Sequence, residues 1–164
     1  MGPERARTPP PELKGALAGG RPTRQNCKVD NLTQRERSLQ MARVKSRDTR
    51  PELAVRRAAH RAGFRYRLHV AELPGCPDIV FPARRKIIFV HGCFWHGHPG
   101  CARNRTPKSR RGFWVPKLGL NRDRDTRNLR RLRRQGWKVE IIWECETERK
   151  ERLERKLLRF LRQS

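Results

Sequence analysis

The sequence predicts an α/β fold in which a mixed central sheet is flanked by helices. Two observations carry this prediction. Short apolar runs of strand length alternate with longer segments whose apolar residues recur at helical spacing, and turns rich in glycine and proline separate them. The predicted order is helix, three strands, helix, strand, helix. With 164 residues, the chain is long enough for one domain with a buried core.

The amino-terminal part differs in composition from the rest. Residues 1–30 are rich in proline, glycine and arginine and show no hydrophobic period, which predicts a disordered basic extension. Residues 31–164 are predicted to form the folded domain. Within it, residues 32–45 are basic with few apolar positions, a pattern that fits either a short helix or an arm that orders on a partner.

The first predicted helix begins at Thr49. Thr49 and Glu52 form a capping-box pattern, and Gly63 stands where a helix is expected to end. Three predicted strands follow, at residues 64–68, 78–81 and 87–90. The remaining predicted elements are a helix from Phe113 to about Gln135, a strand at residues 137–143 and an amphipathic helix at residues 148–162.

Charge indicates the partner. The chain carries 41 Lys and Arg residues against 16 Asp and Glu, a formal charge of +25. This excess predicts a polyanion, and the arginines favour phosphates because a guanidinium pairs with two phosphate oxygens at once. Nucleic acid is therefore the predicted partner. We predict an intracellular, cytoplasmic protein and no membrane, because the sequence shows neither a bilayer-spanning apolar stretch nor a secretion signal. The odd number of cysteines, five, agrees with a reducing compartment.

A cluster of cysteines and histidines follows the predicted strand at residues 87–90. Three cysteines and one histidine favour a structural, tetrahedral zinc, with the set Cys93, His98, Cys101 and Cys145. Cys145 meets the others only if the strand at residues 137–143 lies beside the strand at residues 87–90. The alternative is that Cys145 is an ordinary buried thiol.

Pro77-Asp78 opens a predicted strand, and a carboxylate there can hold Mg²⁺ against a scissile phosphate. The alternative is that Asp78 is only a turn residue and binds no metal. The order of a helical Glu52, then Asp78, then a strand resembles the layout of PD-(D/E)xK nucleases, and so implies a restriction endonuclease-like fold. The strand departs from that pattern, because Phe89-Val90-His91 stands where the acidic residue and the lysine belong.

Histidine is the predicted replacement for the missing motif. His91 and His96 flank the end of the strand, and an imidazole can activate water or protonate a leaving oxygen. His96 also competes with His98 for the zinc. Asp125, on the next predicted helix, can orient one of the histidines. The alternatives are histidines that only line a polar loop and an Asp125 that is an exposed helix charge, and spacing leaves both open.

Three aromatic residues, Phe94, Trp95 and Trp114, lie in a basic part of the sequence. Their rings can stack on bases or wedge between them, although core packing is the commoner fate of such residues. For Trp137 and Trp143, which lie on a strand pattern, we predict core packing.

Four segments, in this order and spacing, resemble the very short patch repair (Vsr) endonucleases: LPGCPDIVF, FVHGCFWHGHPGC, FWVPKLGLNRDRD and GWKVEIIWEC. The resemblance runs from about Gln40 to Cys145, and HGCFWH with WEC is its most specific part. It implies a Mg²⁺-dependent nickase that hydrolyses a phosphodiester bond of duplex DNA 5′ of the thymine of a T·G mismatch. Such mismatches arise when 5-methylcytosine deaminates. It also implies a monomer that works with repair-pathway proteins at the nucleoid of a prokaryote.

The resemblance implies roles for individual residues. Those that match catalytic positions of the family are Asp78, His91, His96, Asp125 and Glu52. Mg²⁺ is matched to Asp78 and to the backbone carbonyl of Val90, and structural Zn²⁺ to Cys93, His98, Cys101 and Cys145. Those that match DNA-contacting positions are Met41, Phe94, Trp95, Trp114, Lys117 and Asn121. Val90 departs from members with threonine, a change that a backbone contact tolerates.

Two other functions fit the composition. One is a zinc-stabilised DNA-binding protein without catalysis, in which Asp78 is a turn residue. The other is a nuclease without mismatch preference. A nicking assay on matched and T·G-containing duplexes separates all three.

Overall fold

The computed structural model describes residues 33, 35, 45 and 47–163. The chain divides into two compact units, Met1–Arg43 and Val44–Ser164, and the elements below all belong to the second. The predicted extension at residues 1–30, its boundary with the domain, and Met41 lie outside the described residues.

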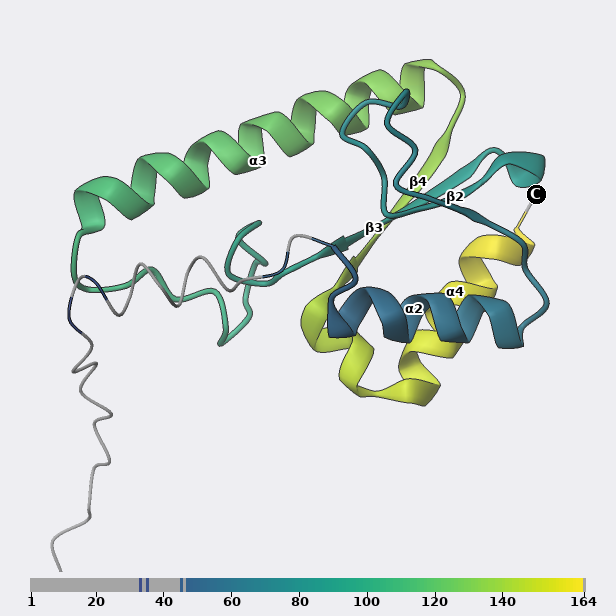
Figure 1. Ribbon diagram of the computed structural model, residues 1–164, viewed down its shortest axis with the longest axis horizontal. Coiled ribbons are helices and arrows are strands. Elements are labelled where there is room, and N and C mark those ends of the chain that lie inside the picture. Colours follow the sequence, from purple (N-terminus) through teal and green to yellow (C-terminus); the bar gives the residue numbers. More distant parts are fainter. Residues whose placement is uncertain (1–32, 34, 36–44, 46, 164) are drawn as a thin grey trace, which may run out of the picture. The chain divides into compact units, whose positions relative to one another are not determined.

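The second unit consists of helices on a four-stranded sheet (Figure 1). In chain order its elements are α2 (Arg50–Arg61), β1 (Arg67–Leu68), β2 (Ile79–Phe81), the 3₁₀ turn η1 (Pro82–Arg84), β3 (Lys86–His91), α3 (Arg111–Arg134), β4 (Lys138–Trp143), the 3₁₀ segment η2 (Glu144–Glu148) and α4 (Lys150–Arg162). The strand order is β1-β2-β3-β4, with antiparallel pairing up to β3 and a parallel β3–β4 pair. The prediction of an α/β fold with a mixed sheet flanked by helices is confirmed.

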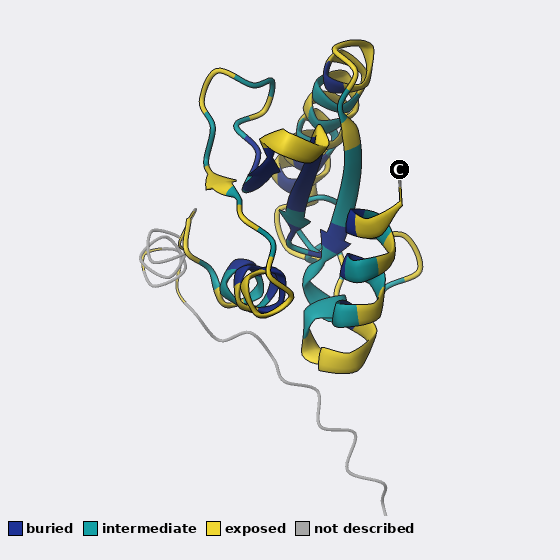
Figure 2. Ribbon diagram, turned by 90° about the vertical axis from the view of Figure 1, so that its right-hand side faces the viewer, coloured by how far each residue is buried: buried dark blue, intermediate teal, exposed yellow. Residues whose placement is uncertain are grey.

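Side chains of the sheet alternate between two apolar clusters, one on each face. On one face, strand residues pack against α2 and α4, and the buried members are Val55, Ala58, Ala59, Ile79, Phe81, Ile88, Ile142, Leu153, Leu157 and Leu161. On the other face, strand residues pack against α3, and the buried members are Val80, Ile87, Phe89 and Leu132. Figure 2 shows the buried residues gathered in the central strands and on the helix sides turned toward them. Each fully buried aliphatic side chain contributes about 1.5–3 kcal/mol, so these clusters fix the sheet between its helices.

Local signals set the limits of the helices. The Thr49 side chain accepts from the Glu52 N–H and the Glu52 carboxylate accepts from the Thr49 N–H, so the predicted capping box is present. Gly63 (φ +80°) and Gly136 (φ +79°) follow α2 and α3 in the left-handed region, where a side chain would be strained. Both helix ends therefore lie where the sequence predicts them.

The parallel pairing of β3 with β4 brings the ends of two strands with predicted site residues together. Ile87 pairs with Val139 and His91 with Trp143, so both strands end at the same edge of the sheet. Helix α3 makes the crossover that a parallel pair requires. The condition under which Cys145 reaches Cys93 is therefore met.

Three element predictions differ from the structure. The strand expected at residues 64–68 shrinks to β1, because Phe64 and Tyr66 pack their rings edge-on against Phe81, with centroids 6.3 and 6.0 Å apart. The alternation there reflects ring packing rather than a strand ladder. Helix α3 begins at Arg111, before Phe113, and α4 begins at Lys150, because η2 occupies the residues before it.

Candidate functional site

The carboxyl-terminal ends of β3 and β4 carry the predicted site residues. His91 ends β3, Trp143 ends β4, and the two are partners in the parallel ladder. The loop after β3 and the η2 segment after β4 therefore leave the sheet side by side. Two clusters of side chains form there, and Trp143 contacts a member of each.

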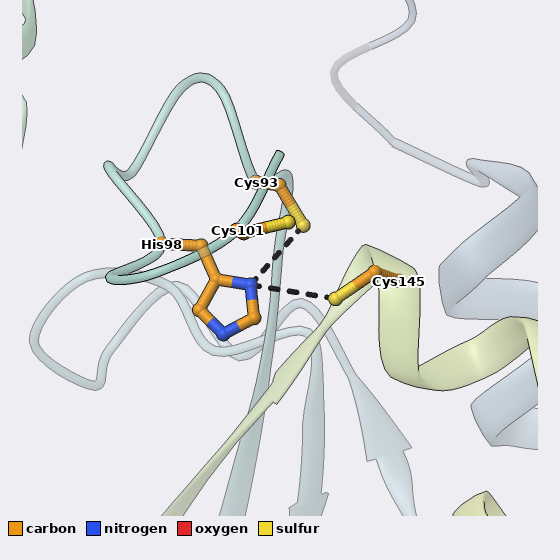
Figure 3. A group of neighbouring side chains, drawn as sticks. All are labelled: Cys93, His98, Cys101 and Cys145. Atoms are coloured by element: carbon orange, nitrogen blue, oxygen red, sulfur yellow. Dashed lines mark hydrogen bonds between the residues drawn. The ribbon is translucent and has the colours of Figure 1, made fainter. Parts of the chain in front are cut away.

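The first cluster consists of Cys93, His98, Cys101 and Cys145, whose potential ligand atoms all lie within 4.8 Å of one another (Figure 3). His98 Nδ1 lies 3.5 Å from Cys93 Sγ and 3.4 Å from Cys145 Sγ. Burial raises the pKa of the Cys93 thiol to about 12, so in the bare protein it holds its proton, which a metal ion would displace. This donor set can hold a metal ion. His98, rather than His96, contributes the imidazole.

Neighbouring groups hold this cluster from outside. Glu144 Oε2 accepts from the Cys93 N–H at 3.2 Å, and Asn104 Nδ2 donates to the His98 carbonyl at 3.0 Å. The Trp143 ring stacks on His98, with centroids 4.2 Å apart and planes 6° from parallel. Trp137 packs on the core beside α3 as predicted, whereas Trp143 is half-buried and lies against the loop. Trp143 is not a core residue, because it ends its strand at the edge of the sheet.

The second cluster lines a cavity of about 320 Å³. Strand, loop and helix residues meet in it, and they are Gly75, Cys76, Asp78, Phe89, His91, His96, Arg124, Asp125, Asn128 and Leu129. Four of the five residues matched to catalytic positions are among them. Glu52 is the exception.

Asp78 lies immediately before β2, on the strand side of the cavity. Its Oδ2 accepts from the Val90 N–H at 2.7 Å. Burial raises the pKa of this carboxyl to about 6, although the Val90 N–H acts in the opposite direction. Among the described residues, no lysine or arginine forms an ion pair with it. A cation in the cavity would therefore stabilise the ionised form of Asp78.

His91 and His96 stack face to face, with ring centroids 3.9 Å apart. His96 Nδ1 lies 2.5 Å from Asp125 Oδ2, so Asp125 orients His96 and is not merely an exposed charge. Burial, and next the neighbouring His96, lower the pKa of His91 to about 3, so its ring is neutral at physiological pH. Burial raises the pKa of Asp125, but His96 and the nearby cationic groups outweigh it, and the net pKa is below the usual value.

Glu52 belongs to a partly buried polar network at the start of α2. Arg56 reaches three partners with its guanidinium: Glu52 at 2.8 Å, Asp48 at 2.5 Å and His69 at 2.9 Å. The charge of Glu52 contributes to the raised pKa of Asp78, after burial. Glu52 does not line the cavity, but its negative charge disfavours ionisation of Asp78. Asp48, Glu52 and His69 also lie close enough to hold a cation, and the Arg56 guanidinium already fills that role.

The aromatic residues matched to DNA contacts form one cluster. Phe94 lies 5.0 Å from Trp95 and 5.4 Å from Trp114, measured between ring centroids. Lys117 Nζ lies 5.8 Å from the centre of the Trp114 ring, and Asn121 Nδ2 donates to the Trp95 carbonyl at 3.3 Å. Except for Met41, the predicted DNA-contacting residues are therefore in one place. Trp114 itself is only 8% exposed.

Comparison with known proteins decides the family. The family model described as DNA mismatch endonuclease Vsr matches residues 29–103. The DNA mismatch endonuclease Vsr of Escherichia coli is 41% identical over 117 residues, which are 71% of this chain and 74% of that protein. The chain belongs to the Vsr family.

Two further relatives of this Vsr-family chain are nicking enzymes by name. The type II nicking enzyme V.XorIIP of Xanthomonas oryzae pv. oryzae is 52% identical over 118 residues, 72% of this chain and 86% of the relative. The type II nicking enzyme V.NmeAIP of Neisseria meningitidis is 39% identical over 135 residues, 82% of this chain and 96% of the relative. The resemblance seen in the sequence is confirmed.

Membership of the Vsr family implies a nuclease fold and supports a DNA mismatch endonuclease, a hydrolase that acts on DNA. In the residues that the structure describes, every helix is too short or too polar to span a lipid bilayer. Family membership favours the enzyme over a DNA-binding protein without catalysis.

The structure adds residues to the Vsr-family site that sequence reasoning missed. Arg56 had a signal, because it lies four residues after Glu52 and so shares its helix face. Arg124 and Asn128 had a weaker signal, because they lie three and seven residues after Asn121 and so share its face of the helix. His69 had none, because it reaches Arg56 through a left-handed turn (φ +47°). Phe113 is 47% exposed and lies 5.1 Å from Trp114 between ring centroids.

Proposed function

We propose that this chain is a Mg²⁺-dependent endonuclease that nicks duplex DNA 5′ of the thymine of a T·G mismatch, in very short patch repair. One observation carries the proposal: Asp78, His91, His96 and Asp125 line a single cavity in a Vsr-family chain. Residues 31–164 form the endonuclease domain in this proposal, and the enzyme acts as a monomer on DNA inside the cell.

The magnesium assignment is supported by the state of Asp78. Mg²⁺ prefers oxygen ligands, and Asp78 offers a carboxylate whose burial disfavours its charge. We assign the ion to Asp78 and to the backbone carbonyl of Val90. Mg²⁺ bound there supplies Lewis-acid stabilisation of charge on the phosphate.

His96 acts as the general base in this proposal. Asp125 holds the Nδ1 nitrogen of His96, which leaves Nε2 to accept a proton from the attacking water. The water oxygen bonds to phosphorus, and the bond from phosphorus to the leaving oxygen breaks. The leaving oxygen takes up a proton from solvent, and His96 later releases the proton of the attacking water to solvent. One water molecule is thus added across one phosphodiester bond. His91, neutral and stacked on His96, supports the ring without competing for the proton.

The Cys/His cluster is assigned to structural zinc. A tetrahedral ion with Zn–S bonds of about 2.3 Å and a Zn–N bond of about 2.0 Å separates nitrogen from sulfur by about 3.5 Å. The Nδ1–Sγ distances from His98 are 3.5 and 3.4 Å, and three thiols and one imidazole are a common structural zinc set. Zinc there holds the loop that carries His96, and takes no part in hydrolysis.

Mismatch preference is assigned to the aromatic cluster. A T·G pair is easier to unstack than a matched pair, so rings that wedge beside it convert deformability into selectivity. Phe94, Trp95 and Trp114 supply the rings, and Lys117 and Asn121 lie along the mismatch. Because Trp114 is buried against Phe94 in the free protein, wedging requires the cluster to open on DNA.

The test is a nicking assay with Mg²⁺ on two duplexes that differ only in one T·G pair. We expect the native protein to cut only the mismatched duplex, on the strand 5′ of the thymine, and Asp78→Ala to cut neither. Asp123→Ala, at an exposed aspartate of α3, is the matched control and should cut like the native protein.

Each other outcome points to a different function. Equal cutting of both duplexes indicates a nuclease without mismatch preference. Binding of DNA without any cutting indicates a zinc-stabilised DNA-binding protein. Cutting by Asp78→Ala removes Asp78 from the mechanism.

A further inference from the structure

Among the described residues that line the cavity of Asp78 and the two histidines, Arg124 is the one lysine or arginine. It lies on α3, one residue before Asp125, at the helix side of the cavity. A phosphodiester that enters this cavity brings a negative charge next to two carboxyl groups. The position of Arg124 therefore matters more than that of other arginines on the surface.

The guanidinium of Arg124 is available to a ligand. Its side chain is 56% exposed, and its ion pair with Asp125 Oδ1 is long, at 3.8 Å. The other oxygen of Asp125 already bonds to His96, at 2.5 Å. Arg124 is thus held near the cavity, and within the described part of the chain most of its five N–H groups remain free to donate.

Two basic residues that pack against the sheet already have partners of their own. The Arg56 guanidinium bonds to Glu52, Asp48 and His69. Lys86, at the far end of β3, donates to the carbonyls of Phe160 at 2.8 Å and Leu161 at 3.2 Å. No lysine or arginine of β3, all of whose residues are described, lines the cavity, because the strand contributes Phe89 and His91 there.

We propose that Arg124 is a catalytic residue whose guanidinium donates to a non-bridging oxygen of the scissile phosphate. Negative charge accumulates on that oxygen as the water oxygen bonds to phosphorus and the bond to the leaving oxygen breaks. A donor close to the oxygen where this charge develops stabilises the transition state more than the ground state. Arg124 exchanges no proton in the step, since His96 takes the proton of the water. The proposal rests on the endonuclease function proposed above.

The test compares Arg124→Ala with Arg127→Ala under single-turnover conditions on the T·G duplex, at enzyme concentrations that saturate binding. Arg127 lies on the same helix, is exposed and does not line the cavity. Its substitution by alanine removes the same charge as Arg124→Ala. We expect Arg124→Ala to slow nicking by about 10²–10³-fold. We expect Arg127→Ala to slow it less than about threefold, with both variants weakening duplex binding alike. Arg124→Lys should recover part of the rate, because it restores a charge without the guanidinium geometry.

A sulfur substitution separates contact from a structural effect. Replacing each non-bridging oxygen of the scissile phosphate by sulfur in turn should slow the native enzyme, and one of the two substitutions should slow Arg124→Ala much less. Equal rates for Arg124→Ala and Arg127→Ala, or unchanged sulfur effects, overturn the proposal for Arg124 while the endonuclease function stands. Failure of the native protein to nick the T·G duplex overturns both.

Discussion

At the scale of single residues, Asp78 shows how the site and the stability of the fold oppose each other. Its carboxyl receives one hydrogen bond, from the Val90 N–H, and burial outweighs that bond so that its pKa rises to about 6. A negative charge at this position therefore costs free energy in the folded chain. The same cost makes Asp78 a good ligand for a cation, because a bound cation offsets it.

We expect Asp78→Asn to raise the free energy of unfolding at about pH 8 while abolishing nicking. Above the raised folded pKa, the native chain holds a buried carboxylate that the unfolded chain solvates. The rise from 3.8 to about 6 corresponds to about 3 kcal/mol at most. The gain should fall to about half at about pH 5, and disappear below the unfolded pKa, where both states are protonated.

Urea unfolding at the two pH values measures this difference. The protein is stripped of divalent cations, so that no ion at Asp78 hides the cost. Asp123→Asn, at an exposed position of the same charge, should change the free energy of unfolding little at either pH. A gain of the same size at both pH values would show that Asp78→Asn acts through something other than the charge.

The residues of the cavity differ in how far the sequence predicted them. Asp78, His91 and His96 stand in short motifs next to strand ends, where a side chain reaches the edge of a sheet, and the sequence predicts their proximity. For Asp125 the spacing alone leaves two roles open, an exposed helix charge and a residue that orients a histidine. Only the fold decides between them, because it brings α3 next to the loop that carries His96. The link from His69 to Arg56 was beyond prediction, since it depends on a turn that no local pattern encodes.

At the scale of elements, the parallel pairing of β3 with β4 assembles the Cys/His cluster. The register that aligns His91 with Trp143 brings Cys145 to Cys93 across more than fifty residues of sequence. The sequence predicts both strands but not that they are neighbours, and the zinc set depends on their being neighbours. Strand order follows from the crossover through α3 rather than from the residues of either strand. Trp143 then links the two clusters, stacked on His98 and edge-on to His91 with centroids 5.5 Å apart.

We expect the purified protein to contain about one equivalent of zinc, and Cys145→Ser to lose it. Loss of the ion should lower the melting temperature and slow nicking, because the loop between Cys93 and Cys101 carries His96. Metal analysis and thermal unfolding of the same samples measure both effects. Cys76→Ser is the matched control for zinc content, as Cys76 lies outside the cluster. A native protein that is folded and free of metal would contradict the zinc assignment.

At the scale of the whole molecule, charge and selectivity have separate sources. The formal charge of +25 is spread over the chain, and the exposed arginines of α3 alone are Arg111, Arg122, Arg124, Arg127, Arg130, Arg131, Arg133 and Arg134. Contacts from such residues to phosphates carry no information about base sequence. In the proposed function, by contrast, the aromatic cluster touches the part of the duplex that a mismatch alters. Affinity and mismatch preference should therefore respond differently to salt.

We expect binding to the matched duplex to fall steeply with salt, because each neutralised phosphate adds about 0.9 to the slope of log K against log salt. With at least five such contacts, doubling the salt concentration should weaken binding by about 20-fold. The ratio of T·G to matched affinity should change by less than about twofold over the same range, since both duplexes release the same counterions.

Titrations of Asp78→Ala, which binds without cutting in this proposal, measure both the salt dependence of the affinity and the ratio of the two affinities. Arg130→Ala, exposed on α3, should reduce the slope by about one for both duplexes and leave the ratio intact, whereas Trp95→Ala should lower the ratio and leave the slope intact. A ratio that falls with salt in parallel with affinity would place mismatch recognition in the phosphate contacts and not in the rings.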